Sequence, residues 1–152
     1  MIRKVKRFLA LSSEEKKLFL EAYIMLAFMQ ISVLTISFKR ITRSLNHSKN
    51  KIKPKKLTDE QLHFAKLVGK MITLAAGNTP WESACLGQAL TAQRMLDKRN
   101  VPGVFYLGVL KNKNAKGKME AHAWSQCGEI IITGGGRDEA FTVLSVFRWG
   151  QG

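Results

Sequence analysis

The N-terminal third of the chain is dominated by one long apolar run. Between Leu18 and Phe38 the only strongly polar interruptions are Glu21 and Gln30. Ser12 with Glu15 three positions later forms a capping-box pattern, which predicts that a helix begins there. We favour a helix packed against a protein core, because a charged residue within a membrane span costs about 2.5 kcal/mol or more. The run is long enough to cross a bilayer and Glu21 lies near its end, so the membrane alternative stays open.

Two further helices are predicted beyond the basic, proline-containing segment 49–56. Thr58 and Gln61 form a second capping box, and apolar residues then recur at steps of three and four as far as residue 76. The next helix contains Cys85 and ends near Lys98.

The start of this last helix is open between two alternatives. Thr79-Pro80-Trp81-Glu82 resembles a capping box with proline at the first helical position. Ser83 could equally cap a shorter helix, which would place Cys85 in its first turn.

From residue 104 onward the pattern takes the two-residue period of strands. A loop over 111–118 and a turn at Cys127-Gly128 separate hairpin partners. Helices followed by an antiparallel sheet indicate an α+β fold. We therefore divide the chain into a basic helical arm with its linker, 1–57, and an α+β domain, 58–152. The predicted strands span 104–110, 119–125, 129–133 and 141–147.

The charge of the chain is concentrated in this arm. The 152 residues carry a formal net charge of +14, and residues 1–57 hold 14 Lys and Arg against 3 Asp and Glu. Such a charge attracts anionic partners, including lipid headgroups and acidic peptides. No basic strand with interleaved aromatic residues and no finger spacing is present, so we do not expect nucleic-acid binding.

The cysteine pattern indicates a reducing compartment. Cys85 and Cys127 form no CxxC motif and no cluster with metal-ligand spacing, so neither a metal nor a cofactor is expected. The basic start of the chain is followed by an apolar run too short for a secretory signal. We therefore expect a cytoplasmic protein, with association to a membrane through residues 18–38 as the alternative.

Cys85 and His122 are the candidate nucleophile and base. A cysteine near a helix N-terminus and a histidine on a strand 37 residues downstream are residue types that cysteine hydrolases bring together. The competing interpretation is a buried, inert cysteine in a membrane-attached scaffold protein. His47 and His63 are expected on the surface, and Cys127 is expected to be structural.

The chain reads W-E-S-A-C-L-G-Q from residue 81, R-N-V-P-G-V-F-Y-L-G-V from residue 99 and E-A-H-A-W from residue 120. Together these three segments resemble the transglutaminase-like leader peptidases of lasso-peptide biosynthesis, a papain-type family. The basic, helical residues 3–45 are also similar to that family. The resemblance implies that Cys85 and His122 are catalytic and that the enzyme cleaves the leader from a ribosomally made precursor.

The resemblance also implies partners. A separate ATP-dependent cyclase would join the freed amine of the core peptide to a side-chain carboxylate. We expect a separate leader-recognition protein as well, because the chain leaves no room for a fused recognition module. Another thiol acyl-transfer activity, of a transglutaminase or an N-acyltransferase, is the alternative on the same scaffold.

The third catalytic member departs from the family pattern. Many relatives carry an acidic residue at the end of the strand after H-A-W, where this sequence has Thr133-Gly134. Asp138, Thr133 or a backbone carbonyl are the candidates to orient His122. We favour a non-acidic group, because holding Asp138 inward from a glycine-rich loop is entropically costly.

Overall fold

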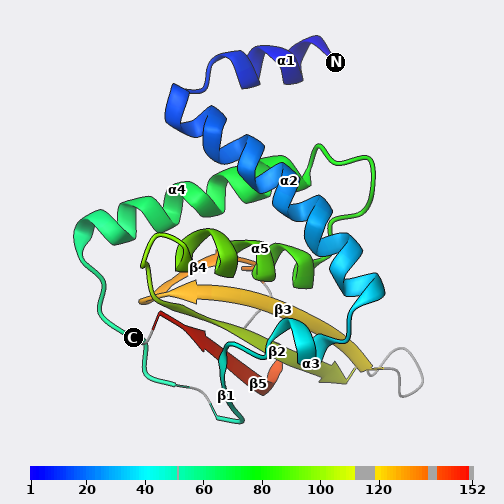
Figure 1. Ribbon diagram of the computed structural model, residues 1–152, viewed down its shortest axis with the longest axis vertical. Helices are drawn as coiled ribbons and strands as arrows, with labels where there is room; N and C mark the ends of the chain where they lie inside the picture. The colour runs from blue at the N-terminus through cyan, green and yellow to red at the C-terminus, as the bar shows by residue number, and fades with distance from the viewer. Residues whose placement is uncertain (51, 112–118, 137–139, 151–152) are drawn as a thin grey trace.

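The computed structural model describes residues 1–50, 52–111, 119–136 and 140–150 (Figure 1). The predicted α+β order is confirmed: helices come first, and strands follow. The helices are α1 (Ile2–Leu9), α2 (Ser13–Thr35), α3 (Phe38–Ile41), α4 (Asp59–Ala76) and α5 (Cys85–Asp97). The strands are β1 (Asn46–Ser48), β2 (Gly103–Lys111), β3 (Met119–Cys127), β4 (Ile130–Thr133) and β5 (Thr142–Trp149).

The strands form one antiparallel sheet in the order β1-β5-β2-β3-β4. Four of them are the predicted strands, with ends shifted by one or two residues. The predicted turn at Cys127-Gly128 joins β3 to β4, and Gly128 adopts a φ of +57° there. The edge strand β1 was not predicted, because its three polar residues carry no apolar period and pair only with the distant β5. Most of the predicted loop 111–118 lies outside the described residues.

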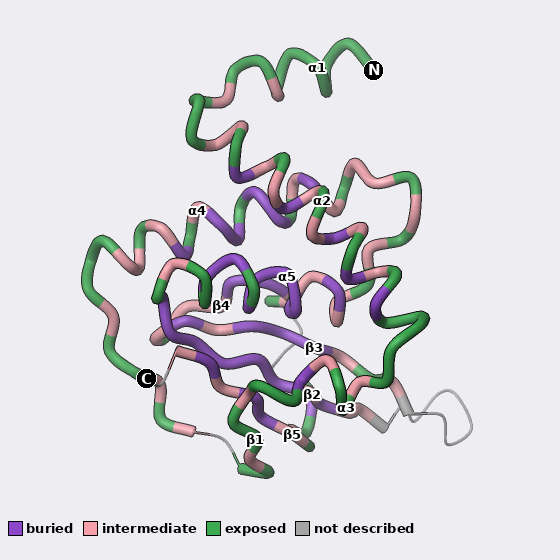
Figure 2. The backbone as a smooth tube through the Cα atoms, viewed as in Figure 1, coloured by how far each residue is buried: buried purple, intermediate pink, exposed green. Residues whose placement is uncertain are grey.

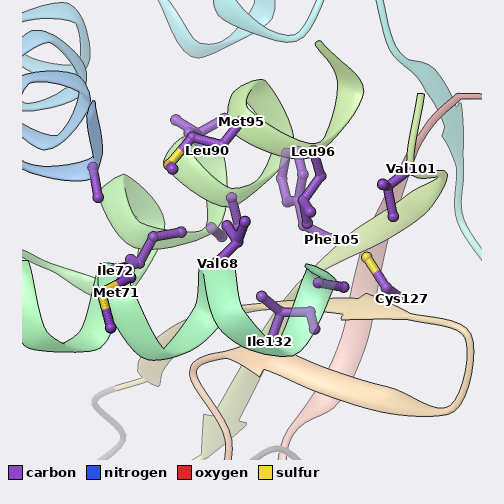
Figure 3. Packing of buried hydrophobic residues seen from close by; sticks show 14 of the residues in the cluster. Val68, Met71, Ile72, Leu90, Met95, Leu96, Val101, Phe105, Cys127 and Ile132 are labelled. Atoms are coloured by element: carbon purple, nitrogen blue, oxygen red, sulfur yellow. The ribbon is translucent and has the colours of Figure 1, made fainter. Parts of the chain in front are cut away.

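The helices build two layers on one face of the sheet (Figure 1). α5 contacts β2, β3 and β4, while α4 contacts β4. α2 lies across α4 and α5 as an outer layer, and it contributes to the same hydrophobic core. Figure 3 shows part of this core, which brings side chains of α4, α5 and the sheet together.

Both predicted capping boxes are present. The Glu15 N–H donates to Ser12 Oγ at 3.2 Å, and the Ser12 N–H donates to Glu15 Oε2 at 2.9 Å. Thr58 and Gln61 make the same reciprocal pair at 3.1 and 3.0 Å. These bonds satisfy amide groups that the first turn of a helix leaves without an internal partner.

The long apolar run of the sequence is α2, and one side of it belongs to the core. Its buried residues include Leu18, Ala22, Leu26 and Met29, which follow one another at three- and four-residue steps. By length and composition this helix could also cross a membrane, a criterion that core helices of soluble proteins meet as well. Because α2 is part of the core, the hydrophobic core extends beyond the predicted boundary at residue 57.

An ion pair ties α2 to the end of α5. Arg99 donates two hydrogen bonds to the Glu21 carboxylate, at 3.0 and 2.6 Å, and Lys98 lies 3.7 Å from the same group. These hydrogen bonds and charges hold the pKa of the Glu21 carboxyl below its ordinary value. Arg99 also covers the ring of Phe64 at 5.3 Å, which links the pair to α4.

We predict that Glu21→Gln lowers the free energy of unfolding by about 1 kcal/mol at neutral pH, because a charge-assisted bidentate pair is lost. A carboxyl with a lowered pKa stabilises the fold above its ordinary pKa, and that contribution disappears as the pH falls through the folded-state value. Urea titrations should therefore show the difference between Glu21→Gln and wild type shrinking in acid. Glu129→Gln, at an exposed turn, serves as the control. A difference that is unchanged at acid pH would contradict this role.

Candidate active site

Cys85 is the first residue of α5 and is half-buried. The shorter of the two predicted helices is therefore right, but Ala84 rather than Ser83 occupies the N-cap. Ser83 does not cap because its side chain is engaged in the preceding loop, where its Oγ lies 2.9 Å from Thr79 Oγ1. The Ser83 carbonyl also accepts a hydrogen bond from Gln88 Nε2 at 2.9 Å, which fixes the loop to the helix.

The N-terminal end of α5 offers amide groups to a negative charge. Its first hydrogen bond runs from the Gln88 N–H to the Ala84 carbonyl at 3.1 Å. No side chain caps the helix at Ala84. The first-turn N–H groups and the positive end of the helix dipole are thus available to a thiolate or to an oxyanion formed beside it.

The Cys85 sulfur lies against β3. The Ala123 N–H donates to Cys85 Sγ at 3.4 Å, and Ala123 directly follows His122. The last pair between β3 and β4 in the described structure is Ser125 with Thr133. Ala123 lies two residues before Ser125, where β3 has no β4 partner, and this is where the sulfur contacts the strand. The structure therefore brings Cys85 to the backbone next to His122, although 37 residues separate them.

The imidazole of His122 is held by a backbone carbonyl. Its Nε2 lies 2.7 Å from the Gly134 oxygen. A carbonyl oxygen can only accept, so Nε2 must carry the proton. In the neutral ring Nδ1 is then the unprotonated nitrogen and can act as a base.

Two aromatic rings restrict the position of the imidazole further. Trp124 stacks with His122 at a ring separation of 5.6 Å and an interplanar angle of 22°. Phe141 approaches it at 4.9 Å with an angle of 37°. Aromatic packing of this kind limits ring rotation, so the hydrogen bond to Gly134 has a well-defined direction.

Of the three candidate orienting groups, a backbone carbonyl is the one that contacts His122 in the described structure. The Thr133 hydroxyl lies 2.6 Å from Ser125 Oγ in a buried pair. Asp138 lies outside the described residues, so its role stays a prediction. The sequence did not single out Gly134, although the run of three glycines marks a segment of unusual backbone freedom.

Gly134 can place its carbonyl there only because it has no side chain. Its φ is +74°, and a Cβ would lie against the Ala123 carbonyl and 2.9 Å from Trp124 Cβ. Any other residue would be strained by both its backbone conformation and its contacts. The close approach of Gly134 to β3 is therefore part of how the site is built.

The remaining candidates lie elsewhere. Cys127 is buried in the core drawn in Figure 3, and burial raises the pKa of its thiol to about 12. His63 is exposed on α4, and exposed His47 lies 3.2 Å from Ser145 Oγ through its Nε2. No group of three or more His, Cys, Asp or Glu that could hold a metal is found within the described ranges.

We predict that iodoacetamide at neutral pH labels Cys85 and leaves Cys127 unmodified in the folded protein. Cys85 is partly exposed at the first turn of α5, whereas Cys127 is protonated and enclosed. Mass spectrometry of the digested protein measures both sites. Cys85→Ala should remain unlabelled until the chain is denatured. Comparable labelling of the two cysteines in the folded state would contradict the assignment.

The comparison with known families agrees with this geometry. A family model described as "transglutaminase-like superfamily" matches residues 28–146, which include Cys85, His122 and Gly134. No curated protein and no solved structure matches the chain. The match covers most of the chain, from the end of α2 to the middle of β5, and it includes both candidate catalytic residues. The chain therefore belongs to the transglutaminase-like superfamily.

Proposed function

We propose that this protein is a cysteine endopeptidase that removes the leader peptide from a ribosomally made lasso-peptide precursor. The observation that carries the proposal is the hydrogen bond from the Ala123 N–H to Cys85 Sγ, because it joins a nucleophile at a helix N-terminus to the strand that holds His122. The superfamily, which commonly contains cysteine-based enzymes, supports the chemistry. The motifs around residues 81–88 and 120–124 support the substrate.

The reaction would proceed through a thioester. His122 Nδ1 takes the thiol proton, and Cys85 Sγ forms a bond to the carbonyl carbon at the end of the leader. The first-turn N–H groups of α5 stabilise the oxyanion. His122 then gives its proton to the nitrogen of the core peptide as the C–N bond breaks. Water, deprotonated by His122, hydrolyses the thioester and releases the leader as a carboxylate.

Gly134 serves as the positioning residue in this scheme. Its carbonyl keeps the proton on Nε2 and so reserves Nδ1 for the thiol. A carbonyl is neutral, unlike a carboxylate, and stabilises the imidazolium by its dipole alone. The freed amine of the core peptide would pass to a separate ATP-dependent macrolactam-forming cyclase, and a separate leader-recognition protein would deliver the precursor.

A second candidate function follows from the family match, which is transglutaminase-like in its description. The same thioester would then be attacked by an amine rather than by water. Incubation of the protein with the precursor and a labelled primary amine separates the two. A leader with a free carboxylate supports the peptidase, and an amide-linked label supports the transferase.

We predict that Cys85→Ala and His122→Ala each abolish cleavage of the precursor while the proteins stay folded, since both residues act in one covalent cycle. Mass spectrometry of the precursor, with the leader-recognition protein present, measures the cleavage, and circular dichroism checks the fold. Cys127→Ala is the matched control and should keep nearly full activity. Turnover by Cys85→Ala would refute the proposal, as would loss of activity in folded Cys127→Ala.

A further prediction concerns the group that orients His122. Gly134→Ala should lower kcat by about a hundredfold, the scale of disabling a positioned catalytic group. Gly136→Ala is the control, because Gly136 also has a positive φ, of +95°, but a Cβ there meets no atom within 4 Å. Asp138→Asn and Thr133→Val should change kcat much less. A hundredfold loss in Asp138→Asn would show that the carboxylate orients His122 instead.

A further inference from the structure

The outward side of α2 carries a line of large apolar side chains. They recur at steps of three and four, so they share one side of the helix. Each has between 52% and 74% of its surface exposed, and the opposite side of α2 is the one packed in the core (Figure 2). We call these residues the α2 stripe; they are Leu20, Ile24, Phe28, Ile31 and Leu34.

Neither the core nor the candidate active site accounts for this stripe. Its residues are absent from the buried clusters, and within the described residues the ring contacts and hydrogen bonds of Cys85, His122 and Gly134 involve none of them. A contiguous exposed apolar surface of this kind marks an interaction site.

Basic side chains lie at both ends of the α2 stripe. Lys16 and Lys17 precede it, and Lys39, Arg40 and Arg43 follow it. The one acidic residue between these groups, Glu21, is already bound to Arg99 and Lys98. Glu14 and Glu15 offset the charge of Lys16 and Lys17 within α2, whereas Lys39, Arg40 and Arg43 form no ion pair among the described residues. The stripe is therefore an apolar strip followed by cations whose charge is not cancelled.

α1 repeats the same chemistry. Its apolar residues Ile2, Val5 and Leu9 share one side and are exposed, and four of the other five positions of the helix are basic. A short helix with such a division of apolar and basic residues is typical of segments that lie in the headgroup region of a bilayer. The basic residues of α1 are Arg3, Lys4, Lys6 and Arg7.

We propose that the α2 stripe, together with α1, binds the surface of an anionic lipid bilayer. The stripe would enter the boundary between headgroups and acyl chains, and the flanking Lys and Arg would extend to the phosphates. A protein partner is less consistent with the stripe, because the centre of a protein interface is enriched in Tyr, Trp and Arg. In the α2 stripe the basic residues lie beyond the two ends, and the exposed centre is aliphatic apart from Phe28.

The experiment is cosedimentation of the full chain with vesicles of phosphatidylcholine and phosphatidylglycerol, compared with phosphatidylcholine alone. We expect binding to the anionic vesicles to be at least about tenfold tighter and to weaken as salt is added. The double variant Ile24→Gln, Phe28→Gln should bind anionic vesicles at least about tenfold more weakly. Leu144→Gln is the control, since Leu144 on β5 is also an exposed apolar residue, and it should bind as wild type does.

The charges are tested separately. Lys39→Gln with Arg40→Gln should weaken binding to anionic vesicles, whereas Lys66→Gln with Arg94→Gln, on α4 and α5, should not. Cys85→Ala should bind like wild type, so failure of the proposed catalytic function would leave this result unaffected. Absence of vesicle binding by wild type would overturn the proposal. A second outcome would also overturn the proposal: the Ile24→Gln, Phe28→Gln variant still binds anionic vesicles but no longer cleaves the precursor that the leader-recognition protein delivers. The stripe would then be a protein interface.

Discussion

The site depends on where β4 stops pairing with β3. The two strands pair only from Thr133 back to the turn at Gly128, so β3 continues beyond its neighbour at the positions that hold His122 and Ala123. At that point the Ala123 N–H meets Cys85 Sγ and the Gly134 carbonyl meets His122 Nε2. An exposed strand edge offers backbone groups that need partners. Here the Ala123 N–H of β3 bonds to Cys85, and the Gly134 carbonyl, just past the end of β4, bonds to the His122 side chain. If β4 continued in register past Thr133, it would compete for the same edge.

The elements that the sequence predicts correctly are those with local causes. Capping boxes at Ser12 and Thr58 depend on residues three apart, and the strand period depends on alternate residues, so both can be identified from short segments. β1 was missed because pairing with β5 across almost a hundred residues defines it. The start of α5 was ambiguous for a related reason: the contacts of Ser83 with Thr79 and Gln88 decide which residue becomes the N-cap.

The same distinction applies to the site. Residue types and motif spacing predicted Cys85 and His122 as nucleophile and base, because these roles require suitable side chains, and the structure places Cys85 beside the strand that holds His122. The group that bonds to His122 in the described structure is a main-chain carbonyl, and every residue has one, so no residue type could mark it. The structure shows why glycine stands at position 134, where a positive φ and the nearby backbone of β3 exclude a Cβ. At position 134 the structure requires the absence of a side chain.

α2 shows why hydropathy alone cannot separate a core helix from a membrane helix. Its two sides are both apolar, so composition gives no inward or outward direction, and the helix lacks the polar face of an ordinary surface helix. The buried residues of α2 and the ion pair between Glu21 and Arg99 at the end of α5 show which side of the helix faces the protein. A bilayer-spanning arrangement would have to break that ion pair and leave a buried charge without its partner, at a cost of about 3–5 kcal/mol, besides exposing the apolar surfaces of α4 and α5. Lying along a bilayer surface requires neither change, because the side that would meet the lipid is the side that the fold leaves exposed.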